Sequence, residues 1–142
     1  MTEAQLHASV AELLAWILLP PAFYTTFPAG WVKLGKATAG SLKGAGMKPG
    51  MPDILIFYKS RVTGIELKVG KAALSPVQFK VHAQLLAAGC KTYVCRCIND
   101  VIMALFTEKI PYRVTHIAIP KGKTDVEIIR RPDLDAGIPT SS

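Results

Sequence analysis

The sequence contains no long apolar run, which disfavours one large class of protein. None of its stretches approaches the roughly 18–20 consecutive apolar residues that a membrane-spanning helix needs. The best candidate, Leu13–Pro21, is short and ends in two prolines. The N-terminus has no basic segment before an apolar stretch, so we expect no secretory signal. The sequence therefore predicts a cytoplasmic protein that does not enter a membrane.

Cysteine is scarce, and its spacing is uninformative for metal or disulfide chemistry. The three cysteines are Cys90, Cys95 and Cys97, an odd number in one cluster, which argues against a disulfide framework. Their spacing also differs from that of zinc ligands. We therefore expect reduced cysteines that pack as small hydrophobic side chains on a strand.

Acidic residues are few. Ten Asp and Glu stand against 17 Lys and Arg, which gives a net charge of +7. Such an excess favours a polyanionic partner, because binding releases counterions from the polyanion. Residues 22–49 contain no acid at all. We predict that four lysines of this segment contact nucleic acid: Lys33, Lys36, Lys43 and Lys48. Lys71, which follows a strand expected over 62–69, is a fifth candidate.

Periodicity and turn residues predict three helices and three strands. The helices are expected over 3–19 with Thr2 as N-cap, over about 76–88 with Ser75 and Gln78 as a capping box, and from Asn99 as N-cap to about 108. The strands are expected over 53–58, 62–69 and 91–98. Residues 22–49 are expected to be irregular.

The order of these elements predicts an α/β domain with a mixed central sheet flanked by helices, because a crossover helix separates two of the strands. With half of its 142 residues hydrophobic, the chain can bury one core. We expect this core domain over residues 1–108. Residues 109–142 would form a partly ordered C-terminal extension, either as part of the same domain or as a tail, with one strand at 115–119 and a candidate second strand at 126–129.

Asp53, Glu66 and Lys68 are the candidates for chemistry. Alternation along the second strand places Glu66 and Lys68 on one face and Ile65 and Leu67 on the other. If the first two strands pair, Asp53 approaches Glu66. Two close carboxylates repel unless a cation such as Mg²⁺ lies between them. An adjacent ammonium can stabilise charge that develops on a phosphate.

These residues also carry a resemblance. Pro52-Asp53, twelve intervening residues and Glu66-Leu67-Lys68 resemble the PD-(D/E)xK nuclease signature. The surroundings are similar to the VRR-NUC domain of the stand-alone phage or bacterial type: Gly50-Met51-Pro52-Asp53-Ile54, Leu74-Ser75-Pro76-Val77-Gln78, His82 and Gly89. The resemblance covers about residues 46–105 and, less closely, the first helix.

The resemblance implies a restriction-endonuclease-like core in a bacterial host or phage-infected cell. Its activity would be a Mg²⁺-dependent endonuclease, with Mn²⁺ as substitute, that hydrolyses DNA phosphodiester bonds. A homodimer would suit branched DNA such as a four-way junction.

By the same resemblance, the metal ligands would be Asp53, Glu66 and the backbone carbonyl of Leu67. Lys68 would be the catalytic lysine. Gln78 would join the site, although it already fits a capping role. The family also uses a glutamate of the first helix, for which Glu3 fits better than Glu12. His82, one turn beyond Gln78, could face the site, but we favour a partly exposed structural histidine.

Other interpretations stay open. One is a non-catalytic nucleic-acid-binding module with the same fold, and another is an accessory of a nucleoprotein assembly. RNA as the substrate is a third. A P-loop-like stretch at 30–37 is rejected, because Ala37 stands where a hydroxyl should ligate Mg²⁺.

Overall fold

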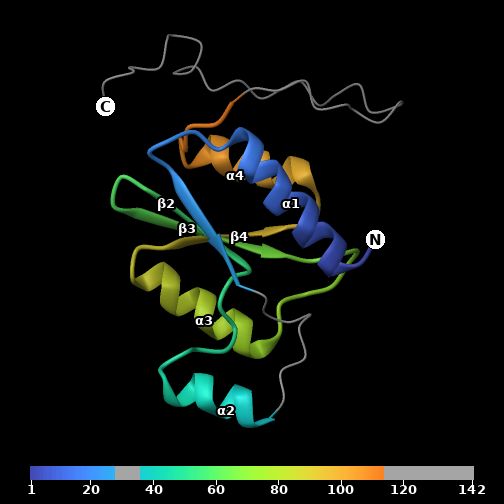
Figure 1. The fold of residues 1–142 in the computed structure, drawn as a ribbon, viewed down its shortest axis with the longest axis vertical. Helices are drawn as coiled ribbons and strands as arrows, with labels where there is room; N and C mark the ends of the chain where they lie inside the picture. The colour runs from blue at the N-terminus through green and yellow to red at the C-terminus, as the bar shows by residue number, and fades with distance from the viewer. Residues whose placement is uncertain (28–35, 114–142) are drawn as a thin grey trace.

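The computed structural model describes residues 1–27 and 36–113, which form four helices and four strands (Figure 1). The helices are α1 (Glu3–Ile17), α2 (Lys36–Gly44), α3 (Pro76–Ala87) and α4 (Ile98–Thr107). The strands are β1 (Phe23–Thr26), β2 (Ile54–Tyr58), β3 (Arg61–Leu67) and β4 (Lys91–Cys95).

The four strands form one sheet in the order β1-β2-β3-β4. The pairs β1–β2 and β2–β3 are antiparallel, whereas β3 and β4 are parallel and joined by α3. A parallel pair requires such a crossover, because a tight turn cannot return the chain in the same direction. The predicted mixed sheet and α/β class are confirmed.

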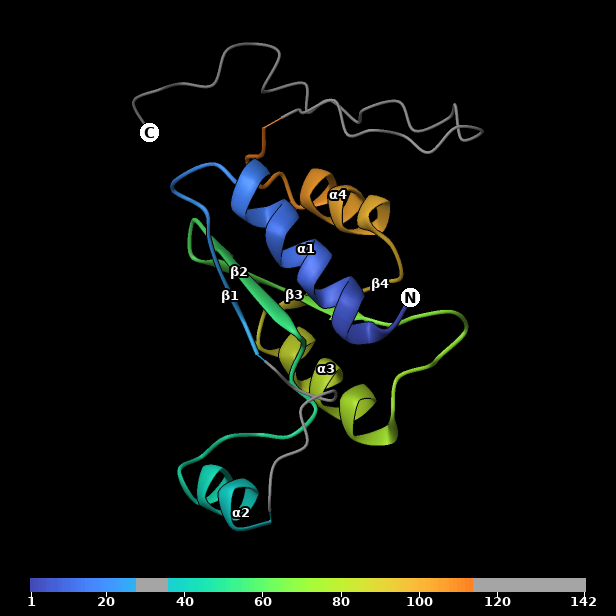
Figure 2. The same cartoon turned by 45° about the vertical axis from the view of Figure 1, so that its right-hand side comes forward.

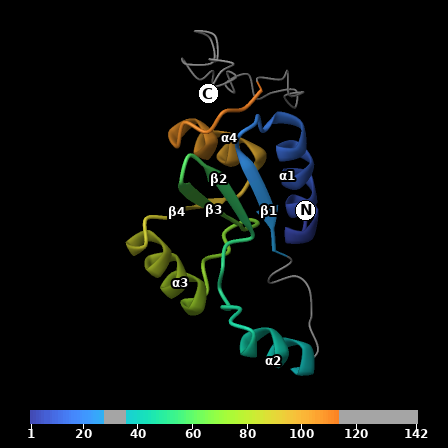
Figure 3. The ribbon, with the colours of Figure 1, turned by 60° about the vertical axis from the view of Figure 1, so that its left-hand side comes forward.

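Helices cover both faces of the sheet. Helices α1 and α4 lie side by side on one face, and α3 lies on the other (Figures 1 and 2). Helix α2 stands away from the sheet, beyond the end of α3 (Figure 3). Helices therefore cover both faces of the sheet at β3, so a side chain on either face of this strand meets a helix.

The hydrophobic core lies between the sheet and the α1–α4 layer. Helix α1 contributes one apolar stripe with helical spacing: Leu6, Val10, Leu14 and Ile17. Strands β2 and β3 contribute the residues that alternate toward this face, among them Ile54, Ile56, Ile65 and Leu67. All of these side chains are at most 2% exposed. The predicted N-cap Thr2 of α1 and the predicted capping box of α3 are both present, and at α1 Gln5 completes a capping box that was not predicted.

Several details of the expected secondary structure are wrong; the strand expected over 91–98, for example, ends at Cys95. Residues 22–49 are not wholly irregular, because Phe23–Thr26 pair with β2 and Lys36–Gly44 form α2. Strand β1 is too short to be recognised without its partner. Helix α4 begins at Ile98, one residue before the expected Asn99 cap, and Cys97 occupies the N-cap without a side-chain hydrogen bond. The Asp100 carboxylate instead accepts a hydrogen bond from the Arg96 backbone N–H.

The chain beyond α4 continues onto the core. Ile110 and Tyr112 are buried, and Tyr112 forms a β-bridge with Leu18. The strands predicted at 115–119 and 126–129 lie outside the described residues. Within the described part of the chain, no helix is both long enough and apolar enough to span a lipid bilayer.

Candidate active site

Asp53 lies directly before β2, at the end of the β2–β3 pair that is remote from their connecting turn. Ile54 pairs with Ile65, so continuing the antiparallel register by one residue sets Asp53 opposite Glu66. Oδ2 of Asp53 accepts a 2.7 Å hydrogen bond from the backbone N–H of Leu67. This contact ties the Asp53 carboxylate to the end of β3, where its side chain is only 7% exposed. The backbone of Leu67 thus lies beside the carboxylate.

Two glycines allow the turn before Asp53 to pack closely. Gly50 has φ +85°, and a Cβ there would lie 2.9 Å from the backbone oxygen of Val77. Gly64 on β3 makes room for Pro52, since a Cβ at Gly64 would lie 2.7 Å from Cγ of the proline. Pro52 is fully buried in this contact. The turn is therefore anchored on β3 and α3, and Asp53 follows directly.

Glu66 and Lys68 point away from the core, as the alternation predicted, but they do not point into water. Helix α3 covers their face of the sheet, and the two residues are 2% and 9% exposed. The Nζ atom of Lys68 lies 3.8 Å from Oε1 of Glu66. Glu66 and Lys68 therefore form a buried ion pair and not one on the protein surface.

Gln78 has two roles at once. Its Nε2 donates a 2.8 Å hydrogen bond to Oε1 of Glu66, while its Oε1 accepts from the backbone N–H of Ser75 in the capping box. Gln78 therefore has the capping role that the sequence predicted, and it also contacts the candidate site residue Glu66. The start of α3 is fastened to the Glu66 carboxylate.

His82 lies one turn further along α3 and is not the partly exposed histidine that we expected. It is 6% exposed, and its Nε2 lies 3.6 Å from Oε2 of Glu66. Burial lowers the pKa of His82, and the nearby Lys68 charge lowers it further. Glu66 is thus approached from α3 on both of its oxygens. The only sequence signal for this position was the spacing of four residues from Gln78.

Burial and nearby negative charge perturb both carboxyl groups. The pKa of Glu66 is raised from 4.5 to about 8, chiefly by burial and then by the charge of Asp53, while Lys68 opposes the shift. Burial likewise raises the pKa of Asp53 from 3.8 to about 6, although the Leu67 N–H opposes this change. Ionising both acids in this place is costly without a further positive charge.

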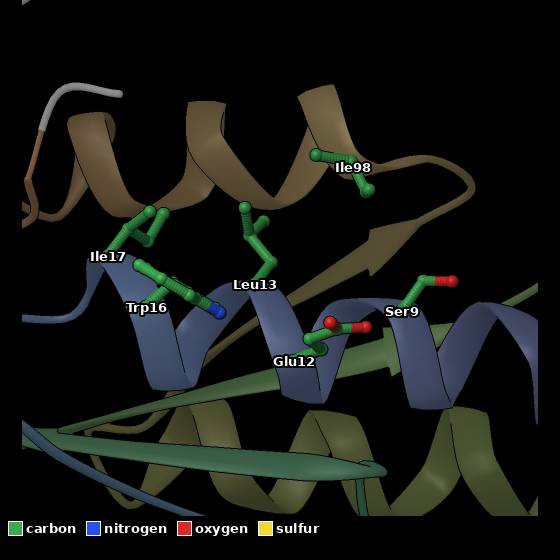
Figure 4. Close-up of a pocket in the computed structure, with 6 residues that line it drawn as sticks. All are labelled: Ser9, Glu12, Leu13, Trp16, Ile17 and Ile98. Atoms are coloured by element: carbon green, nitrogen blue, oxygen red, sulfur yellow. The ribbon is translucent and has the colours of Figure 1, made fainter. Parts of the chain in front are cut away.

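Glu3 and Glu12 lie in different surroundings. The negative charge of Glu3 contributes to the raised pKa of both Asp53 and Glu66. Glu12 instead lines an open pocket between α1 and α4, beside Ser9 and Trp16 (Figure 4). Of the two candidates, Glu3 is the one whose charge reaches the carboxylate pair.

The carboxylates do not form a complete metal site by themselves. Within residues 1–27 and 36–113, no three His, Cys, Asp or Glu side chains are arranged to hold a metal ion. The available donors are Asp53, Glu66 and the adjacent backbone at Leu67. Oε2 of Glu66 is buried and has no hydrogen-bond partner among the described residues. Such a donor set suits a hard cation that keeps several of its own waters.

Only three of the five lysines that we predict to contact nucleic acid have side chains that the structure describes. Lys43, Lys48 and Lys71 are exposed, whereas Lys33 and the side chain of Lys36 lie outside the described residues. All three cysteines are free thiols, as expected. Only Cys95 is a buried residue of a strand; Cys90 is buried just before β4, and Cys97 is exposed at the N-cap of α4, so the expected packing on a strand is wrong for these two.

The mixed four-stranded sheet flanked by helices defines an α/β domain with a restriction-endonuclease-like core. A solved structure described as "VRR_NUC domain protein" has a similar fold, with a TM-score of 0.57 and 20% sequence identity. The similarity covers 75% of this chain and 87% of that chain. Neither the protein-family models nor the curated proteins include a match to this sequence.

Proposed function

We propose that this protein is a metal-dependent endonuclease of the PD-(D/E)xK type that hydrolyses DNA phosphodiester bonds. The observation that carries the proposal is the buried set of Asp53, Glu66 and Lys68 at one end of β2 and β3. Repelling carboxylates are costly to bury, and a protein that needed only stability would gain nothing from them. Perturbed acids of this kind are typical of functional sites.

The residues divide the chemistry among themselves. Asp53, Glu66 and the carbonyl of Leu67 would hold Mg²⁺, or Mn²⁺ in its place. When bound, such a cation supplies positive charge to the scissile phosphate and makes water more acidic. Lys68 would stabilise the charge that develops on the phosphate during attack. Gln78 orients Glu66, and Glu3 would add negative charge at the edge of the site.

DNA is the proposed substrate because the chain carries a net charge of +7 and an acid-free segment rich in lysine. A domain of this size cannot surround a duplex. We therefore propose a homodimer, in which two active sites act on two strands, and branched DNA such as a four-way junction as the substrate. The stand-alone phage or bacterial type, with its cytoplasmic location, belongs to the same proposal.

The direct test is nuclease activity on plasmid and oligonucleotide DNA with Mg²⁺, with Mn²⁺ and with EDTA. We expect cleavage that requires the divalent ion. Lys68→Ala should lower kcat by about 10²–10³-fold, the effect of removing one group that stabilises transition-state charge. DNA binding in EDTA should remain. Lys80→Ala, which alters an exposed lysine of α3, is the matched control.

Three results would contradict the proposal: no cleavage by the unaltered protein, cleavage that EDTA does not stop, or full activity of Lys68→Ala. DNA binding without cleavage would instead support a binding module with the same fold. A panel of linear, flapped and four-way DNAs, with RNA counterparts, tests the substrate. Equal cleavage of all the DNAs would exclude junction specificity, and light scattering with and without DNA would report on the homodimer.

A further inference from the structure

Glu66 and His82 contain the two unsatisfied polar side-chain atoms that are buried in the described part of the chain. They are Oε2 of the glutamate and Nε2 of the histidine. These two atoms face each other across 3.6 Å. A buried polar atom without a partner is costly. Two such atoms that face each other therefore indicate that they form a hydrogen bond in another state of the site.

The other oxygen of Glu66 is already held. Oε1 accepts from Gln78 at 2.8 Å and lies 3.8 Å from Nζ of Lys68. Contacts to one oxygen restrain the orientation of the carboxylate only in part. A donor on Oε2 would fix the plane of the group, and His82 is the side chain in place to provide one.

The separation of 3.6 Å is only slightly longer than an N–H···O hydrogen bond of about 2.7–3.2 Å. A small rotation of either side chain closes it. A neutral imidazole with its proton on Nε2 is a donor, and a carboxylate oxygen has two lone pairs. Oε2 can therefore accept this hydrogen bond and still face a cation.

We propose that His82 is a positioning residue, whose Nε2–H donates to Oε2 of Glu66 and holds that carboxylate in the orientation that binds the divalent ion. The inference rests on the proposed function, since it presumes that Glu66 is a metal ligand. Residues that orient a ligand in this way typically contribute about 10–100-fold to metal affinity.

The experiment measures Mn²⁺ affinity by the loss of the EPR signal of the free ion, without DNA. His82→Phe keeps an aromatic ring of similar size but removes the donor, and we expect the Kd for Mn²⁺ to rise about 10–100-fold. Gln84→Ala changes an exposed residue of the same helix and should leave the Kd unchanged.

A second pair of variants separates the donor from packing. The amide nitrogen of glutamine reaches approximately as far as Nε2 of histidine, whereas that of asparagine reaches only as far as Nδ1. His82→Gln should therefore recover most of the affinity, and His82→Asn should not. In nuclease assays the loss in His82→Phe should be overcome by raising the Mn²⁺ concentration, with KM for DNA unchanged.

An unchanged Kd in His82→Phe would overturn the inference, as would equal losses in the Gln and Asn variants. If His82→Phe does not fold, the Gln and Asn pair decides. The unaltered protein reports separately on the proposed function. Normal Mn²⁺ binding and cleavage with insensitive His82 variants would reject only the role of His82, whereas no Mn²⁺ binding by the unaltered protein would reject both.

Discussion

Gln78 donates a 2.8 Å hydrogen bond to Oε1 of Glu66 with the same side chain that caps the first turn of α3. Gln78 thereby links the N-terminal end of α3 to the carboxylate of Glu66 on β3. The cap stabilises α3, and α3 in turn shields Glu66 from water. Stability and site geometry are coupled at this position and can be separated by a pair of substitutions.

Gln78→Ala and Ser75→Ala should separate the two roles. Each removes one half of the capping box, and we expect each to lower the free energy of unfolding by about 1 kcal/mol. Only Gln78→Ala also removes the donor to Glu66, so only that variant should lose nuclease activity. Urea unfolding and initial cleavage rates measure the two effects. Equal activity losses in both variants would contradict a specific role of Gln78 at Glu66.

The stability of the metal-free protein should depend on pH through Asp53 and Glu66. Their pKa values are raised on folding, from 3.8 to about 6 and from 4.5 to about 8. The folded state therefore binds these protons more tightly than the unfolded state. This contribution is complete below pH 3.8 and is lost as pH rises through 6 and 8. At about 1.4 kcal/mol per pKa unit, the loss is on the order of several kcal/mol.

Urea unfolding in EDTA between pH 5 and pH 8.5 or so tests this expectation. Glu66→Gln should reduce the pH dependence and should be more stable than the unaltered protein at the upper end of the range. Its neutral amide carries no buried charge. Added Mg²⁺ should restore stability to the unaltered protein but not to Glu66→Gln. Stability that rises with pH in EDTA would show that the two carboxyls are ionised at little cost.

Gly64→Ala should displace the turn that carries Asp53. The added Cβ would lie 2.7 Å from Cγ of Pro52 and 3.1 Å from Cγ2 of Thr92. We expect a loss of about 1–3 kcal/mol, as for overpacked cores, together with weaker metal binding. Gly40→Ala is the matched control, because its Cβ meets nothing within 4 Å. A Gly64→Ala protein with unaltered stability would mean that Pro52 moves freely.

Lys43 and Lys48 should act on DNA affinity rather than on catalysis. Both are exposed and lie in and after α2. The double substitution to alanine should lower DNA affinity uniformly across sequences. It should also reduce the slope of log K against log salt concentration by about 1 per lysine. Fluorescence anisotropy at several salt concentrations measures this slope. Lys59→Ala, at the β2–β3 turn, should leave it unchanged.

Much of the site could be predicted from the sequence, because its signals are local. Period-two alternation set Glu66 and Lys68 on a common face, and Ser75 with Gln78 marked the start of α3. His82 could not be predicted in this way. Its burial depends on how closely α3 packs on the sheet, and a sequence pattern gives no information about that distance. Strand β1 was missed for a similar reason, since its pairing with β2 is what makes it a strand.

The sequence by itself determined which segments around the site form helices and which form strands. It also determined the alternation that separates core side chains from candidate catalytic ones. It did so because turns, caps and alternation act between residues a few positions apart. Only the tertiary structure decided that the face of β3 that carries Glu66 is buried beneath α3. That burial, which joins segments distant in the chain, raises the pKa of both carboxyl groups and leaves Oε2 of Glu66 without a hydrogen-bond partner among the described residues.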